Sequence, residues 1–160
     1  MILSEKKFLM EYSELTKTII KCAYTVYNKM GFGFLESVYE KCMLIELNKA
    51  GLDAESQKPL KVYYDGKIVG EFIADITVNN TIILELKSVS RIIKAHEVQL
   101  VNYLVATGKP IGLLINFGER RVDVKRKVKE LNRINGEDIF EFHHKNNHES
   151  PVNPVEIREI

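Results

Sequence analysis

Thr81-Ile-Ile-Leu-Glu-Leu-Lys87 places two charged residues, Glu85 and Lys87, inside a stretch that otherwise resembles a core strand. A second apolar stretch, Glu71-Phe-Ile-Ala-Asp75, ends in an acid shortly before it. Because ionised groups are costly to bury without partners, two carboxylates and a lysine on neighbouring core strands need a specific explanation. The residues favour a divalent-metal site that cuts phosphodiester bonds.

The composition suits a single domain. The chain has 160 residues, 45% of them hydrophobic, which is enough to build one core. Cys22 and Cys42 lie in segments that look helical and are interpreted as buried thiols. No apolar run approaches the ~20 residues of a membrane helix, and Met1 to Lys7 carry charges where a signal peptide has its apolar core. The sequence therefore predicts a cytoplasmic protein with no membrane partner.

The charge of the whole chain gives little attraction to nucleic acid. Lys and Arg number 23 against 22 Asp and Glu, a formal net charge of +1. Any such binding must therefore rely on local basic patches. Candidates are Arg120-Arg121 and Lys125-Arg126-Lys127, which are equally well explained as a solvated face of a strand and a helix.

Helical periodicity covers residues from about 4 to 30, 35 to 50 and 94 to 107. Gly51 suits the left-handed conformation that ends a helix. Strand periodicity covers 60–64, 67–78, 81–87, 111–117 and 121–125, and a short helical stretch is expected after Lys127. The strand, helix, strand unit from 81 to 117 implies parallel pairing. We therefore expect an α/β fold, a mixed β-sheet flanked by α-helices, in a domain at 1–130 with a partly ordered C-terminal extension at 131–160.

The loop between the second and third strands decides whether the two acids meet. A two-residue turn at Asn79-Asn80 would place Ala74 opposite Glu85, so that Asp75 and Glu85 would face opposite sides of the sheet. A three-residue loop, 79–81 with Asn80 or Thr81 in an unusual conformation, instead places Asp75 opposite Glu85. The apolar pattern favours the second register. Only this register gathers these residues on one face: Phe72, Ala74, Ile76, Val78, Ile82, Leu84 and Leu86.

Paired carboxylates and a lysine have definite roles in such a site. Opposed β-carbons lie about 5 Å apart, close enough for Asp75 and Glu85 to share one cation. Mg²⁺ prefers oxygen ligands, and Mn²⁺ is the alternative. Lys87 lies two positions after Glu85 on the same side of its strand, where an ammonium can orient a water or offset negative charge. Taken alone, this spacing also fits a surface ion pair, and Asp75 also fits a solvated residue.

Two helices supply further candidates. Glu36 shares a stripe with Tyr39 and Met43, so its carboxylate is expected to face the apolar side rather than open water. There it is a candidate for a further metal ligand or for positioning a metal-bound water, although an acid in the first turn also complements the helix dipole. Gln99 and Tyr103 stack at i and i+4, which equally fits a partly buried polar edge. His96, one turn before Gln99, could act as an acid or base, but it is interpreted as a peripheral or structural histidine.

The joint pattern is more specific than its parts. Gly33-Phe-Leu-Glu36-Ser-Val-Tyr39, Asp75, Glu85-Leu-Lys87 and the helix carrying Gln99 and Tyr103 resemble the GxxExxY proteins of the PD-(D/E)XK nuclease superfamily, over roughly residues 10 to 127. The resemblance implies a restriction-endonuclease-like core with metal bound by Asp75 and Glu85. It also implies supporting roles for Glu36, Lys87, Gln99 and Tyr103, and the Leu86 carbonyl is a candidate third ligand.

The leading hypothesis is thus a Mg²⁺- or Mn²⁺-dependent nuclease acting on nucleic acid, DNA being the favoured substrate. The alternative is a non-catalytic module that binds nucleic acid or protein on a nuclease-like core. A homodimer is one expectation for a small domain that cuts duplexes. His143, His144 and His148 could bind a transition metal, but an incidental cluster in a polar tail is the simpler explanation.

Overall fold

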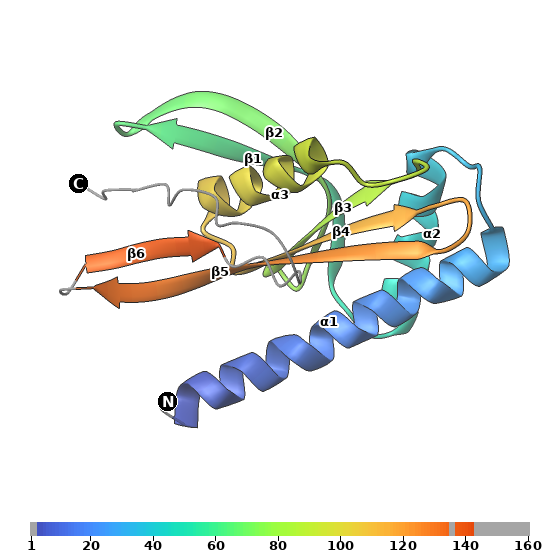
Figure 1. Cartoon of the computed structure of the whole chain (residues 1–160), viewed down its shortest axis with the longest axis horizontal. Helices are drawn as coiled ribbons and strands as arrows, with labels where there is room; N and C mark the ends of the chain where they lie inside the picture. The colour runs from blue at the N-terminus through green and yellow to red at the C-terminus, as the bar shows by residue number, and fades with distance from the viewer. Residues whose placement is uncertain (1–2, 135–136, 143–160) are drawn as a thin grey trace.

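The computed structural model in Figure 1 describes residues 3–134 and 137–142. Two helices open this part of the chain, a meander of three strands follows, and a third helix leads to the remaining strands. The elements are α1 (Leu3–Met30), α2 (Glu36–Lys49), β1 (Ala54–Tyr64), β2 (Lys67–Val78), β3 (Ile82–Lys87), α3 (Lys94–Thr107), β4 (Ile111–Phe117), β5 (Val122–Ile134) and β6 (Glu137–Phe142). None of the described helices has the length and apolar character that crossing a membrane requires.

The strands lie side by side in the order β1-β2-β3-β4-β5-β6. The β3–β4 pair is parallel and the other neighbours are antiparallel. The mixed sheet predicted from the sequence is therefore confirmed, with α3 as the connection between the two parallel strands. Gly51, at φ +76°, has the left-handed conformation expected after the second helix.

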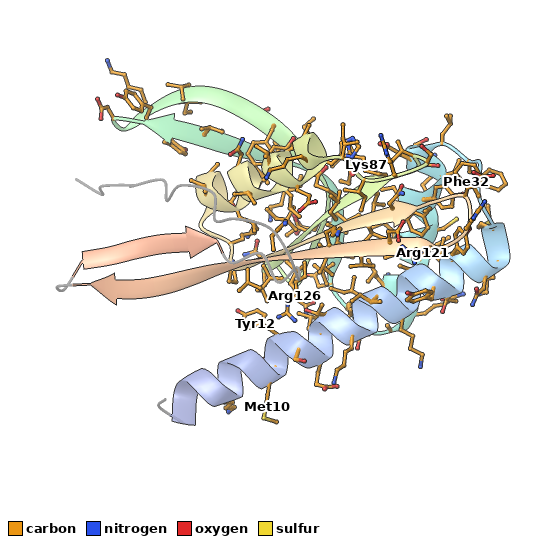
Figure 2. The ribbon with its side chains drawn as sticks, viewed as in Figure 1. Met10, Tyr12, Phe32, Lys87, Arg121 and Arg126 are labelled. Atoms are coloured by element: carbon orange, nitrogen blue, oxygen red, sulfur yellow. The ribbon has the colours of Figure 1, made fainter. Side chains whose placement is uncertain are left out.

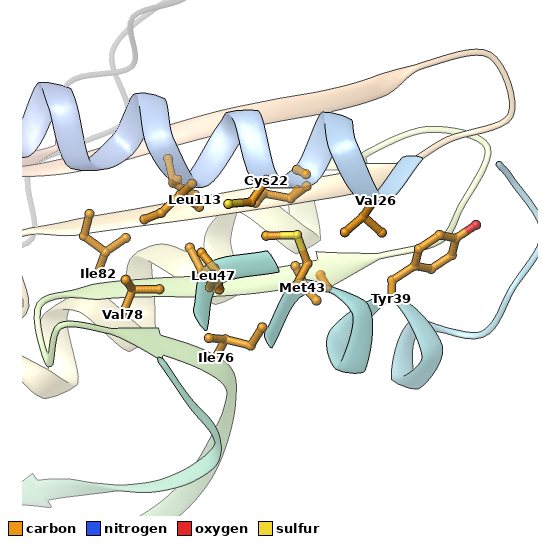
Figure 3. Packing of buried hydrophobic residues seen from close by; sticks show 14 of the residues in the cluster. Cys22, Val26, Tyr39, Met43, Leu47, Ile76, Val78, Ile82 and Leu113 are labelled. Atoms are coloured by element: carbon orange, nitrogen blue, oxygen red, sulfur yellow. The ribbon is translucent and has the colours of Figure 1, made fainter. Parts of the chain in front are cut away.

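Helices cover both faces of the sheet (Figure 1). On one face, α1 and α2 pack against the sheet through a buried cluster that includes Cys22, Met43 and Leu113, which Figure 3 shows in close contact. On the other face, Leu100 and Leu104 of α3 form a second cluster. The sheet is thus the middle of three layers, and its central strands are shielded from water on both sides.

The strand β2 changes layers along its length. Ile76 and Val78 belong to the cluster under α1 and α2, whereas Phe72 and Ala74 belong to the cluster under α3. The expectation that all four share one face was wrong. Side chains of β2 do not strictly alternate between the two faces, because the strand bends near Asp75. On the N-terminal side of Asp75, the β1–β2 hairpin curves over α3 (Figure 1).

Two other elements differ from expectation. β1 begins at Ala54, several residues earlier than predicted. The segment after Lys127 is not helical but continues β5, which pairs with β4 up to Val128 and with β6 beyond it. Val128, Leu131 and Ile134 are spaced three apart, a spacing that is also typical of a helix. Backbone pairing with β6 instead holds this segment extended.

Gly112 on β4 allows α3 to approach the sheet closely. A β-carbon added there would lie 2.6 Å from Leu100 Cδ1 and 2.9 Å from its Cγ, and Leu100 is fully buried. We therefore expect Gly112→Ala to lower the free energy of unfolding by about 1–3 kcal/mol through overpacking, measured by urea denaturation. Gly70→Ala is the matched control because its nearest neighbour, Val62 Cβ, lies 4.0 Å away. Equal loss in both variants would contradict the packing argument.

Candidate functional site

The register of the β2–β3 hairpin brings the two acids together. Val78 pairs with Ile82 and Ile76 with Leu84, so one further step places Asp75 level with Glu85. The predicted three-residue loop is therefore confirmed. Within it, Asn79 and Asn80, at φ +49° and +51°, take the left-handed conformation, whereas Thr81 does not. A short polar side chain makes this conformation tolerable for asparagine.

Past the Ile76–Leu84 pair, where the backbone pairing of β2 with β3 ends, a side-chain hydrogen bond links the two strands. The Leu86 backbone N–H donates to Asp75 Oδ2 at 2.7 Å. Because the N–H and C=O of an extended residue point to the same side of a strand, the Leu86 carbonyl also faces β2. The carbonyl proposed as a third ligand thus lies on the side of β3 where Asp75 lies.

Glu85 is the most unusual group of the site. Its exposed fraction is 4%, and its Oε1 has no hydrogen-bond partner among the described residues. Burial first, and then the charge of Asp75, raise the pKa of Glu85 to about 8, while Lys87 acts in the opposite direction. A buried carboxyl with an unused oxygen lacks a partner for its charged form.

Asp75 is half-buried and shares this environment. Its pKa is raised, chiefly by burial, while the hydrogen bond from Leu86 and the charge of Lys87 lower it and the charge of Glu36 raises it. The structure therefore brings the four charged residues of the sequence prediction within electrostatic reach of one another: Glu36, Asp75, Glu85 and Lys87.

The chain after Lys87 is held firmly. Lys87 is level with Asn116 on β4, a fully buried residue. The Asn116 side chain accepts a hydrogen bond from Val89 N at 3.0 Å and donates one to Val89 O at 2.9 Å. Ser88 Oγ donates to Phe34 O at 2.8 Å, which ties this loop to the one before α2. Figure 2 shows Lys87 and Phe32 at this end of the molecule.

Glu36 occupies a different setting from the one expected. It is exposed to solvent, not turned toward the apolar side of α2 with Tyr39 and Met43, so that expectation was wrong. α2 begins at Glu36 itself, and the start of its first turn is open to water. Its charge nevertheless reaches the acid pair, since it contributes to raising the pKa of both Asp75 and Glu85.

Glu40, one helical turn after Glu36, is a further acid near the site that was not predicted from the sequence. Glu40 is half-buried, and its Oε2 accepts a hydrogen bond from Gln57 Nε2 at 2.8 Å. Its pKa is raised, first by burial and further by the charge of Asp75, against the effect of the Gln57 hydrogen bond. The signal available in the sequence was the spacing of four residues from Glu36, which places two acids on one face of the helix.

Gln99 and Tyr103 are on α3, the helix that packs on the face of the sheet opposite α1 and α2. Gln99 Nε2 donates to Tyr103 Oη at 2.6 Å, and the Tyr103 ring stacks on Phe72 with centroids 3.7 Å apart. The pKa of Tyr103 is raised, mainly by burial and in part by the charges of Glu85 and Asp75, which places the phenol near the acid pair. His96 Nδ1 accepts a hydrogen bond from Ile93 N at 3.3 Å, in keeping with a structural role at the start of α3.

The basic patches are weaker than the sequence suggests. Lys127 is 3% exposed and forms an ion pair with Glu97 of α3. Arg121 forms an ion pair with Asp123 at 2.7 Å. Lys127 is therefore not available to a nucleic acid at the surface. The three histidines of the tail, His143, His144 and His148, lie outside the described residues.

The donor set suits a hard divalent cation. No three Asp, Glu, His or Cys side chains gather into a metal-binding group within the described ranges. An ion here would have the Asp75 and Glu85 carboxylates and the Leu86 carbonyl as protein ligands, with water in the other positions. Mg²⁺ commonly binds through one or two carboxylates and keeps several waters. The unpartnered Glu85 oxygen therefore fits such an ion.

The comparisons with known proteins concern most of the chain. Residues 13–128 match the PD-(D/E)XK nuclease superfamily. No curated protein matches the chain. The crystal structure of SSO0001 is similar over 79% of this chain and 62% of that one, with 21% sequence identity and a TM-score of 0.47. The chain thus spans less than two thirds of the length of that protein.

Proposed function

Because the chain belongs to the PD-(D/E)XK nuclease superfamily, we propose that it is a divalent-metal-dependent nuclease that hydrolyses phosphodiester bonds. The observation that carries the proposal is the buried Glu85 carboxyl, which lies beside Asp75 with an unpartnered oxygen and has Lys87 on the same side of its strand. The sheet that carries Asp75 and Glu85 is packed between helices on both faces, yet one oxygen of Glu85 is left without a hydrogen bond among the described residues. Such an arrangement is typical of a site that is completed by a ligand.

Each residue has a separate task in this proposal. Asp75 and Glu85 hold Mg²⁺ or Mn²⁺, together with the Leu86 carbonyl, and Glu36 assists from the water-exposed end of α2. When bound there, such an ion would supply Lewis-acid chemistry, polarising a phosphate and lowering the pKa of a water. Lys87 orients the attacking water or offsets the charge that develops on the phosphate. Gln99 and Tyr103 support the site from α3, where the stack on Phe72 restricts the phenol.

The substrate in this proposal is nucleic acid, with DNA favoured over RNA. Two exposed aromatic side chains in the loop before Glu36, Phe32 and Phe34, provide rings on which bases can stack. Assignment to the GxxExxY proteins, a domain boundary near residue 130 and a homodimer are further parts of the proposal. A cytoplasmic location is supported by the free thiols of Cys22 and Cys42.

The test is cleavage by the purified protein of labelled DNA and RNA, single- and double-stranded, in Mg²⁺, Mn²⁺ or EDTA. We expect cleavage in either metal, none in EDTA, and recovery when metal is restored. The Asp75→Asn variant, purified in parallel, reveals a contaminating nuclease, since cleavage by both preparations would not come from this site. Binding of nucleic acid without cleavage in any metal would instead support the non-catalytic alternative.

A further inference from the structure

Gln57 has an unusual backbone conformation for its position. It lies within β1 at φ +53°, in the left-handed region that residues with a β-carbon rarely adopt. Ser56 pairs with Ile76 and Lys58 with Ala74, so Gln57 lies directly opposite Asp75, where β2 bends. Backbone strain of this kind persists only where surrounding contacts impose it, and it gathers at functional sites.

The side chain of this left-handed residue, Gln57, reaches α2. Its Nε2 donates to Glu40 Oε2 at 2.8 Å, a contact between an edge strand and a helix. Glu40 is half-buried, and the charge of Asp75 is among the causes of its raised pKa. Gln57 therefore fixes a carboxylate close to Asp75 although the two negative charges repel each other.

A separate observation points to a cation beside this group of acids. Glu85 is 4% exposed, and its Oε1 is unpartnered among the described residues. No three Asp, Glu, His or Cys side chains form a metal-binding group in the described part of the chain, so Glu40 does not join Asp75 and Glu85 as a third carboxylate ligand. A carboxylate at this position can act on the ion through its water molecules.

We propose that Gln57 is a positioning residue of the metal site, which holds the Glu40 carboxylate where it accepts hydrogen bonds from waters on the cation bound by Asp75 and Glu85. The inference rests on the proposed function for the cation itself. It adds two residues, on β1 and α2, that increase the affinity for the ion without touching it. Replacing a residue that contacts a metal ion only through its ligands or waters typically changes metal affinity by about 10- to 100-fold.

The experiment measures Mn²⁺ binding by calorimetry and unfolding in urea for the wild type, four test variants and one control variant. Gln57→Gly relieves the left-handed strain and removes the amide, and Gln57→Asn tolerates the same conformation with a shorter side chain. Both should bind Mn²⁺ about 10-fold more weakly without unfolding at lower urea concentration. Glu40→Gln, which keeps a hydrogen-bonding partner for Gln57 but no charge, should weaken binding to the same degree. The double variant Gln57→Gly/Glu40→Gln should be no weaker than Glu40→Gln alone.

The control is Asp65→Gly, another left-handed residue, at φ +49°, in the turn of the β1–β2 hairpin. It should leave Mn²⁺ affinity unchanged. Wild-type affinity in Gln57→Gly or in Glu40→Gln would overturn the inference while leaving the metal site in place. If the Gln57 and Glu40 variants lose Mn²⁺ affinity but the wild type cleaves no nucleic acid, the inference would be supported and the proposed reaction rejected. A wild type that binds no Mn²⁺ would reject both.

Discussion

Replacement of Lys87 by alanine is expected to lower kcat for nucleic-acid cleavage by about 10²- to 10³-fold, the usual loss when one group that stabilises developing charge is removed. Lys87 lies two residues after Glu85 on β3 and contributes to the pKa of both acids of the site. It is not a ligand, so the affinity for Mn²⁺ should persist. Single-turnover cleavage and Mn²⁺ calorimetry on the same preparation separate the two effects.

The matched control is Lys67→Ala, an exposed lysine that begins β2 directly after the turn of the β1–β2 hairpin. It carries the same charge but lies outside the site, and its kcat should equal that of the wild type. Lys87→Ala with unchanged kcat would remove the lysine from the proposed mechanism. If Lys87→Ala also lost Mn²⁺ binding and unfolded earlier in urea, the role of Lys87 would be structural.

Glu85→Gln is expected to abolish metal-dependent cleavage and Mn²⁺ binding, and to stabilise the metal-free protein at pH 8.5 by about 1–3 kcal/mol. The neutral amide keeps the shape of the side chain without the cost of burying a charge. The affected side chain is 4% exposed, so solvent screens it little. Urea unfolding in EDTA measures the difference, and Glu71→Gln, an exposed acid on β2, is the control.

The pH dependence of this difference follows from the pKa of Glu85, which burial raises from 4.5 to about 8. Between these values the folded state keeps a proton that the unfolded chain has lost, so this group makes wild-type stability fall as the pH rises from about 4.5 to about 8. Glu85→Gln lacks this contribution, and its advantage should grow over the same interval. An advantage that is equal at pH 5 and pH 8.5 would contradict the assignment. Binding of Mg²⁺ should release a proton in this interval, because the ligand must ionise.

The central register of the sheet was predictable from the residues around Asn79-Asn80. Ile82, Leu84 and Leu86 alternate with Ile83 and Glu85, and only the three-residue loop aligns the first set with Ile76 and Val78. The structure confirms this pairing. Sequence alone was sufficient here because the period of a strand and the length of a hairpin are local properties.

Failures of prediction occurred where distant segments meet. The bend of β2 near Asp75 accompanies the packing of Phe72 against Tyr103, which is 31 positions away in the chain. The burial of Lys127 depends on Glu97 of α3. The strand after Lys127 depends on pairing with β6. None of these partners is indicated by local periodicity, because side chains far apart in sequence are brought together only by folding.

By itself, the sequence determined the α/β order of elements, the mixed sheet and the approach of Asp75 to Glu85, since hydrophobic periodicity sets which side of each strand enters the core. Only the tertiary structure decided that Glu85 is buried with an unpartnered oxygen, that Glu36 stays in water and that Gln57 holds Glu40 near Asp75. The physical reason is that burial and pKa depend on every layer packed around a group. A charged side chain acquires its chemistry from neighbours that come together only in the folded chain.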